Sequence, residues 1–201
     1  MSSTNRSNAR DNHISDYYIT PQKPIIDLFN VLKEQEPTRH LFLTADKLNP
    51  EMKYLDSCAG GDDKNDMSYP KLLSSFGIDA ITYDIRQDSK ASIKQDFLTV
   101  DIDVDEAPWV VITNPPFNIA ESIINKSLEI VDEGGYVIML LRLNFFGSRK
   151  RKAFWKNNMP ILTIVHHERI SFTGGQTDSI EYMHCVWRKG QKQDFTTLII
   201  V

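Results

Sequence analysis

Apolar positions recur along the chain with two different periods, and these periods predict helices and strands in turn. Helical spacing over residues 25–35 predicts a first helix. Short apolar runs at 53–58, 80–85 and 108–113 have the length of strands. A nearly unbroken apolar run at 136–143 is typical of a strand covered on both faces, which indicates a sheet between two layers of helices.

Further helices are predicted between these runs, at 69–76, at 119–132 and in a basic segment after 143. Gly134 and Gly135 end the second of these, as glycines often do. The segments 161–167 and 179–187 predict a late pair of strands. This order predicts an α/β fold with a mainly parallel sheet, in which ligands bind beyond the carboxyl ends of the strands.

Composition limits the class of protein. A chain of 201 residues with 41% hydrophobic and 25% charged residues is typical of one soluble domain, and no apolar run reaches the length of a membrane span. The polar residues 1–13 resemble no signal peptide and predict a disordered arm, followed by a single domain at 14–201. Cys58 and Cys185 have no metal-ligand spacing, which fits two reduced thiols in a cytoplasmic protein.

The net charge of -4 argues against nonspecific coating of nucleic acid, yet the segment 142–157 is locally basic and aromatic. It contains no acidic residue. Phosphate contacts are predicted for these residues: Arg142, Arg149, Lys150, Arg151 and Lys152. The alternative is a solvated helix face, which is the usual meaning of a run of charge.

Polar and small residues follow each predicted strand. Asp56 precedes Gly60 and Gly61, which permit a tight turn that a ligand can approach closely. Asp84 follows the next strand and is suited to ribose hydroxyls. Asp96 offers an acceptor for an exocyclic amine, with the flat ring of the next residue beside it. Each feature alone is also compatible with an ordinary turn.

The segment 110–118, VVITNPPFN, is more specific. A buried strand leads directly into Asn114, Pro115, Pro116 and Phe117, and neither strands nor helices tolerate two consecutive prolines well. Prolines can simply end a strand, but the amide and the aromatic ring beside them add chemistry.

With this tetrapeptide, the sequence resembles the S-adenosylmethionine-dependent DNA N6-adenine methyltransferases, and among them small bacteriophage-type enzymes. The resemblance extends from YYITP near residue 17 to VWRKG near 190. It implies a Rossmann-like class I methyltransferase fold, with helices on both faces of the sheet and a late antiparallel strand. It also implies S-adenosylmethionine as the cofactor, bound by these residues: Tyr18, Thr20, Pro21, Asp56, Cys58, Ala59, Gly60, Asp84, Ile85, Asp96, Phe97 and Asn114. The family usually has a further glycine where this chain has Asp62.

The resemblance implies methyl transfer to the N6 amine of adenine in DNA, with catalysis by Asn114, Pro115, Pro116 and Phe117. The Asn114 side-chain oxygen and the Pro115 carbonyl would accept the two amine hydrogens and direct the nitrogen lone pair at the methyl group. The prolines would fix both acceptors, and Phe117 would stack on a base flipped out of the duplex.

Some assignments remain open. The sequence is compatible with two roles for Tyr18 and Phe172, which are lining a ligand pocket and ordinary packing. His166 and His167 have no partner ligands nearby in the sequence and are interpreted as structural, with no metal predicted.

Other functions remain possible on sequence alone: methylation of RNA adenine, methylation of a glutamine amide in protein, or an inactive scaffold with this fold. The predicted location is the cytoplasm of a bacterium or of a phage-infected host, with DNA as the partner and no membrane. The target sequence and the oligomeric state are not predicted.

Overall fold

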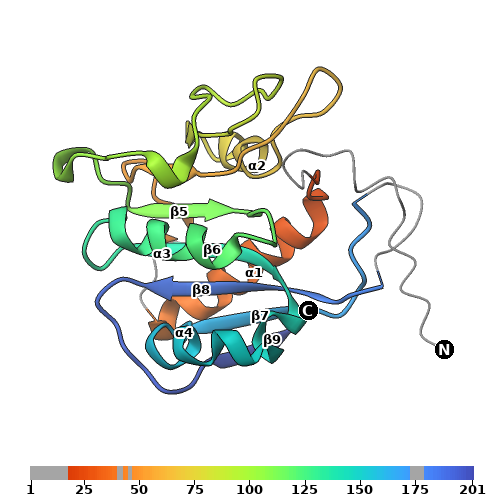
Figure 1. The fold of residues 1–201 in the computed structure, drawn as a ribbon, viewed down its shortest axis with the longest axis vertical. Coiled ribbons are helices and arrows are strands. Elements are labelled where there is room, and N and C mark those ends of the chain that lie inside the picture. Colours follow the sequence, from red (N-terminus) through yellow and green to blue (C-terminus); the bar gives the residue numbers. More distant parts are fainter. Residues whose placement is uncertain (1–17, 40–42, 45–46, 173–178) are drawn as a thin grey trace.

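A seven-stranded sheet forms the centre of the protein, in the order β4-β3-β5-β6-β8-β7-β9 (Figure 1). The computed structural model describes residues 18–39, 43–44, 47–172 and 179–201, so the predicted arm at 1–13 lies outside the described residues. The strands are β3 (Tyr54–Asp56), β4 (Ile81–Thr82), β5 (Val110–Thr113), β6 (Tyr136–Arg142), β7 (Leu162–His166), β8 (Tyr182–Arg188) and β9 (Thr197–Ile200). Within this sheet only β8 runs antiparallel to its neighbours, which confirms the prediction of a mainly parallel sheet with a late antiparallel strand.

Helices cover both faces of the sheet, as predicted. Helices α1 (Gln22–Arg39) and α2 (Ser68–Ser75) cover one face, and α3 (Ala120–Ile130) and α4 (Lys152–Asn157) cover the other (Figure 1). Successive residues of β6 contribute to the two separate cores: Ile138 packs in the core that includes α1 and α2, and Met139 in the core that includes α3 and α4. Burial on both faces explains why β6 is almost entirely apolar.

Two segments with predicted site residues contain 3-10 turns. The segment 96–100 contains a 3-10 turn, η2 (Phe97–Thr99). The basic segment is not one helix but two 3-10 turns, η4 (Leu143–Gly147) and η5 (Arg149–Arg151), followed by α4. Trp155 Nε1 donates to the Phe145 carbonyl at 3.3 Å, a contact over ten residues that a continuous α-helix would not allow.

The remaining elements are small. Strands β1 (Leu43–Thr44) and β2 (Lys47–Leu48) form a separate antiparallel pair, and η3 (Val104–Glu106) precedes β5. Strand β9, which the sequence pattern did not predict, pairs in parallel with β7 at the edge of the sheet. In the described part of the chain, no helix has the length and apolar character needed to cross a membrane.

The topology brings distant residues to one edge of the sheet. The parallel strands β3, β5 and β6 end there at Asp56, Thr113 and Arg142. Because β8 is antiparallel, its first residue, Tyr182, lies opposite Arg142 at the same edge. The predicted ligand-binding residues therefore meet residues from the late part of the chain.

Candidate functional site

The loop after β3 is closely packed around two glycines with positive φ. Gly60 has φ 67° and Gly61 has φ 73°, conformations that other residues rarely adopt. A Cβ atom on Gly61 would lie 2.9 Å from Met67 Cγ and 3.1 Å from Lys90 Cβ. The Lys90 backbone N–H also donates to the Gly60 carbonyl at 3.2 Å. The glycine pair is therefore required by the backbone here.

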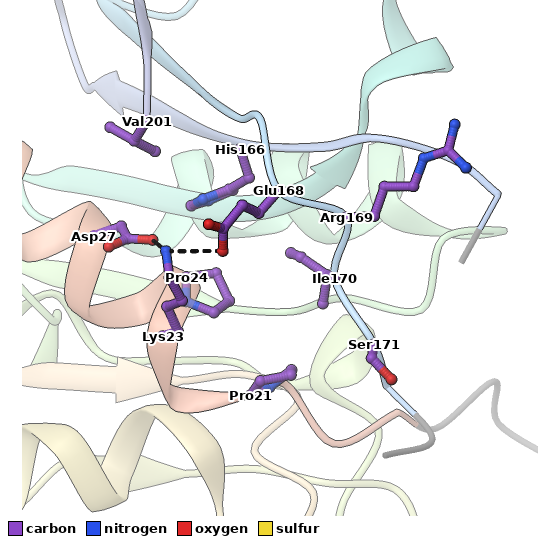
Figure 2. Close-up of a pocket in the computed structure, with 10 residues that line it drawn as sticks. All are labelled: Pro21, Lys23, Pro24, Asp27, His166, Glu168, Arg169, Ile170, Ser171 and Val201. Carbon is purple, nitrogen blue, oxygen red and sulfur yellow. Dashed lines mark hydrogen bonds and ion pairs between the residues drawn. The ribbon is translucent and has the colours of Figure 1, made fainter. Parts of the chain in front are cut away.

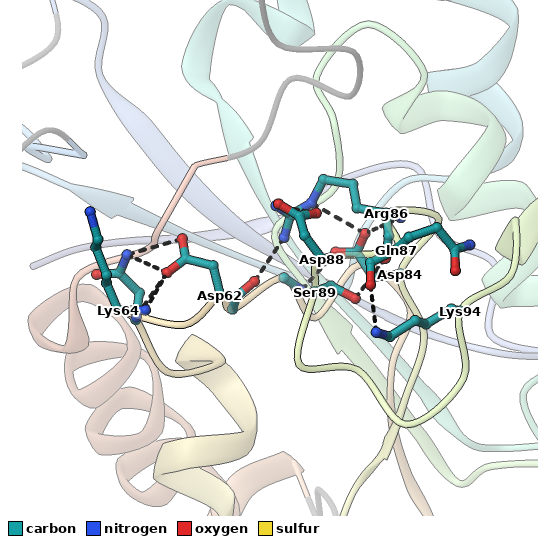
Figure 3. A network of polar contacts seen from close by, with 11 residues as sticks. Asp62, Lys64, Asp84, Arg86, Gln87, Asp88, Ser89 and Lys94 are labelled. Atoms are coloured by element: carbon teal, nitrogen blue, oxygen red, sulfur yellow. Dashed lines mark hydrogen bonds and ion pairs between the residues drawn. The ribbon is translucent and has the colours of Figure 1, made fainter.

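Asp84, the predicted ribose-binding acid, holds this loop in place (Figure 3). Its Oδ2 accepts a hydrogen bond from the Gly60 N–H at 2.9 Å, and its Oδ1 accepts one from the Arg86 N–H at 2.8 Å. The Arg86 guanidinium lies 3.4 Å from Asp84 Oδ1 and donates to the Gly61 carbonyl at 2.9 Å. Each carboxylate oxygen retains a lone pair for a further donor. Ile85, beside this network, is 56% exposed.

Asp62, which stands where the family that the sequence resembles usually has a glycine, stabilises the next turn. Its Oδ1 accepts hydrogen bonds from the backbone N–H groups of Lys64 and Asn65 at 2.8 and 2.9 Å (Figure 3). These bonds hold the pKa of the Asp62 carboxyl below its ordinary value, the Lys64 N–H being the largest cause. Asp62 therefore closes a turn of its own after the glycine pair and leaves the Gly60–Asp84 contact intact.

Asp56 is buried at the end of β3, where its Oδ1 accepts a hydrogen bond from the Cys58 N–H at 3.1 Å. Burial raises the pKa of Asp56 to about 7, because desolvation outweighs the opposing effects of Thr113 and the Cys58 N–H. Burial also raises the pKa of the Cys58 thiol, so this cysteine is a neutral group. The Ala59 N–H donates to the Tyr83 carbonyl at 2.9 Å, which ties the loop to the end of β4.

Asp96 and Phe97 have mainly structural contacts in this conformation. Asp96 caps η2, since its Oδ1 accepts a hydrogen bond from the Leu98 N–H at 3.0 Å. The Phe97 side chain is 3% exposed and packs edge-on against Tyr83 at 5.9 Å. The Phe97 ring therefore offers no open face on which an adenine could stack.

The side-chain amide of Asn114 has a hydrogen-bond partner for its nitrogen but, among the described residues, none for its oxygen. Its Nδ2 donates to Thr20 Oγ1 at 3.0 Å, which fixes the orientation of the side chain. Its Oδ1 is buried and has no hydrogen-bond partner among the described residues. The Pro116 carbonyl accepts from Ile119 N–H at 3.1 Å and so closes the turn into α3. A buried acceptor without a donor is costly, so it indicates a place where a ligand donor binds.

Phe117 lies inside a group of aromatic side chains at the sheet edge. Its ring is 6.3 Å from that of Tyr18, at an interplanar angle of 25°, and 5.6 Å from that of Tyr182. Phe172 contacts both tyrosines, at 5.6 and 5.0 Å. The Arg142 guanidinium lies over the Phe117 ring, 4.4 Å from its centre. Tyr182 was not predicted as a site residue, since nothing in its local sequence distinguishes it from a core tyrosine.

The basic segment beyond Arg142 contains both exposed and engaged cations. Arg149, Lys150 and Lys152 are exposed and have no ion-pair partner among the described residues. Arg151 is half-buried, with its guanidinium 3.9 Å from the centre of the Phe145 ring and 3.8 Å from a Glu121 oxygen. Three of the five predicted phosphate contacts are therefore exposed cations, and Arg142 and Arg151 contact aromatic rings.

A pocket of about 220 Å³ lies next to this site, between the start of α1 and the segment after β7 (Figure 2). Pro21 lines it, one residue beyond Thr20. Lys23 lies between Asp27 at 2.9 Å and Glu168 at 3.3 Å, so its charge is neutralised within the pocket. His166, also in the lining, donates to or accepts from His184 at 2.7 Å. In the part of the chain that the structure describes, no group of three or more potential ligands could hold a metal ion.

Comparison with known proteins identifies the class of fold. No protein-family model matches the sequence, and no curated protein matches it. A Listeria monocytogenes protein assigned as a class I S-adenosylmethionine-dependent methyltransferase has a TM-score of 0.59 at 14% identity, over 94% of this chain and 68% of that one. A Pyrococcus horikoshii protein assigned as an RNA methyltransferase has a TM-score of 0.55 at 18% identity, over 86% and 87%.

The M protein of the type I restriction enzyme EcoKI is also similar, with a TM-score of 0.51 at 13% identity, over 84% of this chain and 49% of that one. This chain therefore spans about half the length of that protein. At such low identities the similarity shows a shared fold, the Rossmann-like fold of class I methyltransferases.

Proposed function

We propose that this protein transfers a methyl group from S-adenosylmethionine to the N6 amine of adenine in DNA. The orientation of the Asn114 amide carries this proposal: Thr20 binds its Nδ2, and its buried Oδ1 has no donor among the described residues. An adenine amine is the complementary donor, because its two hydrogens can bind two fixed acceptors. The second acceptor is the Pro115 carbonyl, since the Pro116 carbonyl is already bound by Ile119.

The residues around the glycine loop fit the cofactor. Gly60 and Gly61 let the backbone approach a ligand, Asp84 has lone pairs for ribose hydroxyls, and Ile85 exposes an apolar surface beside them. When bound, S-adenosylmethionine supplies the methyl group as a sulfonium. Asp56, the buried carboxyl at the end of β3 beside this loop, is suited to bind the ammonium group of the methionine part, which would favour its ionised form.

The proposed chemistry is positioning by fixed acceptors. Hydrogen bonds to Asn114 Oδ1 and to the Pro115 carbonyl draw the amine out of conjugation with the ring and direct its lone pair at the methyl carbon. The nitrogen–carbon bond forms as the carbon–sulfur bond breaks, and the electron pair stays with sulfur. The amine then loses one proton to water. The buried strand β5 and the two prolines hold the acceptors rigidly.

DNA as the substrate is supported by the exposed cations Arg149, Lys150 and Lys152, which lie after β6 on the segment that begins at the site edge. They would bind phosphates while the target base enters the pocket. The similarity of fold to the M protein of a restriction enzyme agrees with this substrate.

The test measures methyl transfer from labelled S-adenosylmethionine to duplex DNA, RNA and a protein extract, with modified nucleosides identified by mass. N6-methyladenine in DNA is the expected product. Asn114→Ala should reduce the rate by about 100-fold or more with normal cofactor affinity, because one of two fixed acceptors is lost. Asn118→Ala, at the exposed amide in the same turn, is the matched control. Label in RNA or protein alone would overturn the assignment of DNA.

A further inference from the structure

Arg142 has a specific position on the Phe117 ring. It is the last residue of β6, and its backbone pairs with Tyr182 on β8, so its Cα is held by the sheet. Its guanidinium lies 4.4 Å from the centre of the Phe117 ring. Its Nε is buried without a hydrogen-bond partner among the described residues, and none of their carboxylates forms an ion pair with it. Stacking on Phe117 is therefore its principal contact.

This arrangement leaves no room on Phe117 for a base. The Phe117 side chain is 9% exposed, with Tyr18, Tyr182 and Arg142 around the ring. An adenine can stack there only after one neighbour leaves. Tyr182 is fully buried, and Tyr18 packs against Phe172. Arg142 has a long, flexible side chain with an unneutralised charge, so it is the group that can leave.

A guanidinium is planar and stacks on aromatic rings in the manner of a base, and it also binds phosphate through two parallel hydrogen bonds. We propose that Arg142 occupies the stacking position of the target adenine in the free protein and exchanges it for a phosphate of the DNA when the base enters. The inference rests on the proposed function and extends it. Arg142 is a positioning residue, since it contacts the base-stacking ring and the backbone of the substrate.

The exchange makes the site selective for a base within a polynucleotide. A base on a DNA strand displaces Arg142 and supplies the phosphate that receives it. A free nucleoside must displace the same guanidinium without offering any new partner for the charge. The site should therefore bind deoxyadenosine poorly, and this discrimination should depend on Arg142.

The test compares two affinities in the same variants: deoxyadenosine by calorimetry, and a duplex by fluorescence anisotropy over a range of salt concentrations. Arg142→Ala should bind deoxyadenosine about two- to fivefold more tightly, because the nucleoside no longer competes with the cation–π contact. The same variant should bind DNA about tenfold more weakly, with a salt slope lower by about one. A merely structural role for Arg142 does not produce effects of opposite sign.

Two control variants distinguish the effect on phosphate binding from the effect on base stacking. Arg149→Ala removes an exposed cation and should lower the salt slope while leaving deoxyadenosine affinity unchanged. Arg188→Ala removes a guanidinium 5.5 Å from the Tyr136 ring, at the other end of β8, and should change neither affinity. If Arg142→Ala does not fold, Arg142→Lys should keep the salt slope and still bind deoxyadenosine more tightly, because an ammonium is not planar and covers less of the ring than a stacked guanidinium.

Unchanged or weaker deoxyadenosine binding in the folded Arg142 variants would overturn the inference, as would wild-type protein that does not bind DNA. Both affinities are measured without turnover. A wild-type protein that binds DNA but transfers no methyl group to adenine would therefore contradict the proposed function, while the opposite effects on the two affinities would still decide the role of Arg142.

Discussion

The hydrogen bond from Asn114 Nδ2 to Thr20 Oγ1 links residues that are 94 positions apart in the sequence. Without it, the amide could rotate and present its NH₂ group where the proposed mechanism needs an acceptor. Thr20 is 3% exposed, so water is poorly placed to replace its hydroxyl. The geometry of the proposed catalytic acceptor thus depends on a residue outside the tetrapeptide.

Thr20→Val should therefore reduce the rate of methyl transfer by about fivefold, the effect of losing one buried hydrogen bond of about 1 kcal/mol. Valine has nearly the same shape, so packing is preserved. Single-turnover kinetics with saturating cofactor and DNA measure the effect. Thr20→Ser keeps the hydroxyl and should retain most of the rate. Equal losses in the two variants would contradict a role for the hydrogen bond.

At the scale of elements, the glycine loop after β3 depends on close packing as well as on backbone conformation. Gly61 has φ 73° and Gly77 has φ 77°, but a Cβ on Gly61 would meet Met67 at 2.9 Å, whereas one on Gly77 would meet nothing within 4 Å. A comparison of substitutions at these two positions therefore separates the cost of the steric clash from the cost of the left-handed conformation.

Gly77→Ala should lower the free energy of unfolding by about 1 kcal/mol, the strain of a left-handed conformation. Gly61→Ala should lower it by about 2–3 kcal/mol, because the loop must also shift. Urea unfolding measures both. The shift should also weaken cofactor binding in Gly61→Ala, and it should not do so in Gly77→Ala. Similar losses of stability would mean that the loop adjusts freely.

Some of the secondary-structure elements could be predicted from the sequence and others could not. β5, β6, α1, α2 and α3 lie close to their predicted positions, because each buries a long apolar run or stripe against the sheet. β9 was not predicted, since it is a strand of only four residues that lies at the sheet edge and pairs with a strand more than thirty positions earlier. Local periodicity carries no information about such a partner.

The residues of the candidate site also divide into those that the sequence predicts and those that only the folded structure brings together. The loop glycines and Asn114–Phe117 were predicted because each lies next to a strand end and has distinctive chemistry. The Thr20 hydroxyl that orients Asn114, the Tyr182 ring beside Phe117 and the stacked position of Arg142 arise from tertiary packing. No motif could reveal the contacts of Tyr182, whose local sequence is that of any buried strand.

At the scale of the whole molecule, a buried hydrogen-bonded chain joins three elements. The Tyr69 hydroxyl on α2 lies 2.8 Å from His184 Nε2 on β8, and His184 Nδ1 lies 2.7 Å from His166 Nε2 on β7. Burial lowers the pKa of His166 to about 4 and that of His184 well below its ordinary value. Both histidines are therefore neutral in the folded protein near pH 7.

This burial makes stability depend on pH. Between pH 6.5 and about 4 the unfolded chain binds a proton at His166 that the folded chain does not, so stability falls as the pH falls through this range. The expected loss is up to about 3 kcal/mol, because each tenfold difference in proton affinity between the folded and unfolded states corresponds to about 1.4 kcal/mol. Asp56, whose pKa is raised, acts in the opposite direction over much of the same range.

The contribution of His166 is therefore measured as a difference. Urea unfolding at pH 7 and pH 4.5 should show a smaller pH dependence in His166→Gln than in the wild-type protein. His167→Gln, at the exposed next position, is the matched control that leaves the buried pair intact. An identical pH dependence in His166→Gln and the wild-type protein would show that His166 does not drive the acid sensitivity.

The position of β8 has a consequence for biosynthesis. This strand lies between β6 and β7, although it follows both of them in the chain, and it brings Tyr182 to the ring of Phe117. On the ribosome, the strands up to β7 emerge before the one that must separate β6 from β7. The aromatic group around Phe117 is therefore completed only when the segment through Arg188 has emerged, so a nascent chain that stops earlier cannot form the site at which the base would stack.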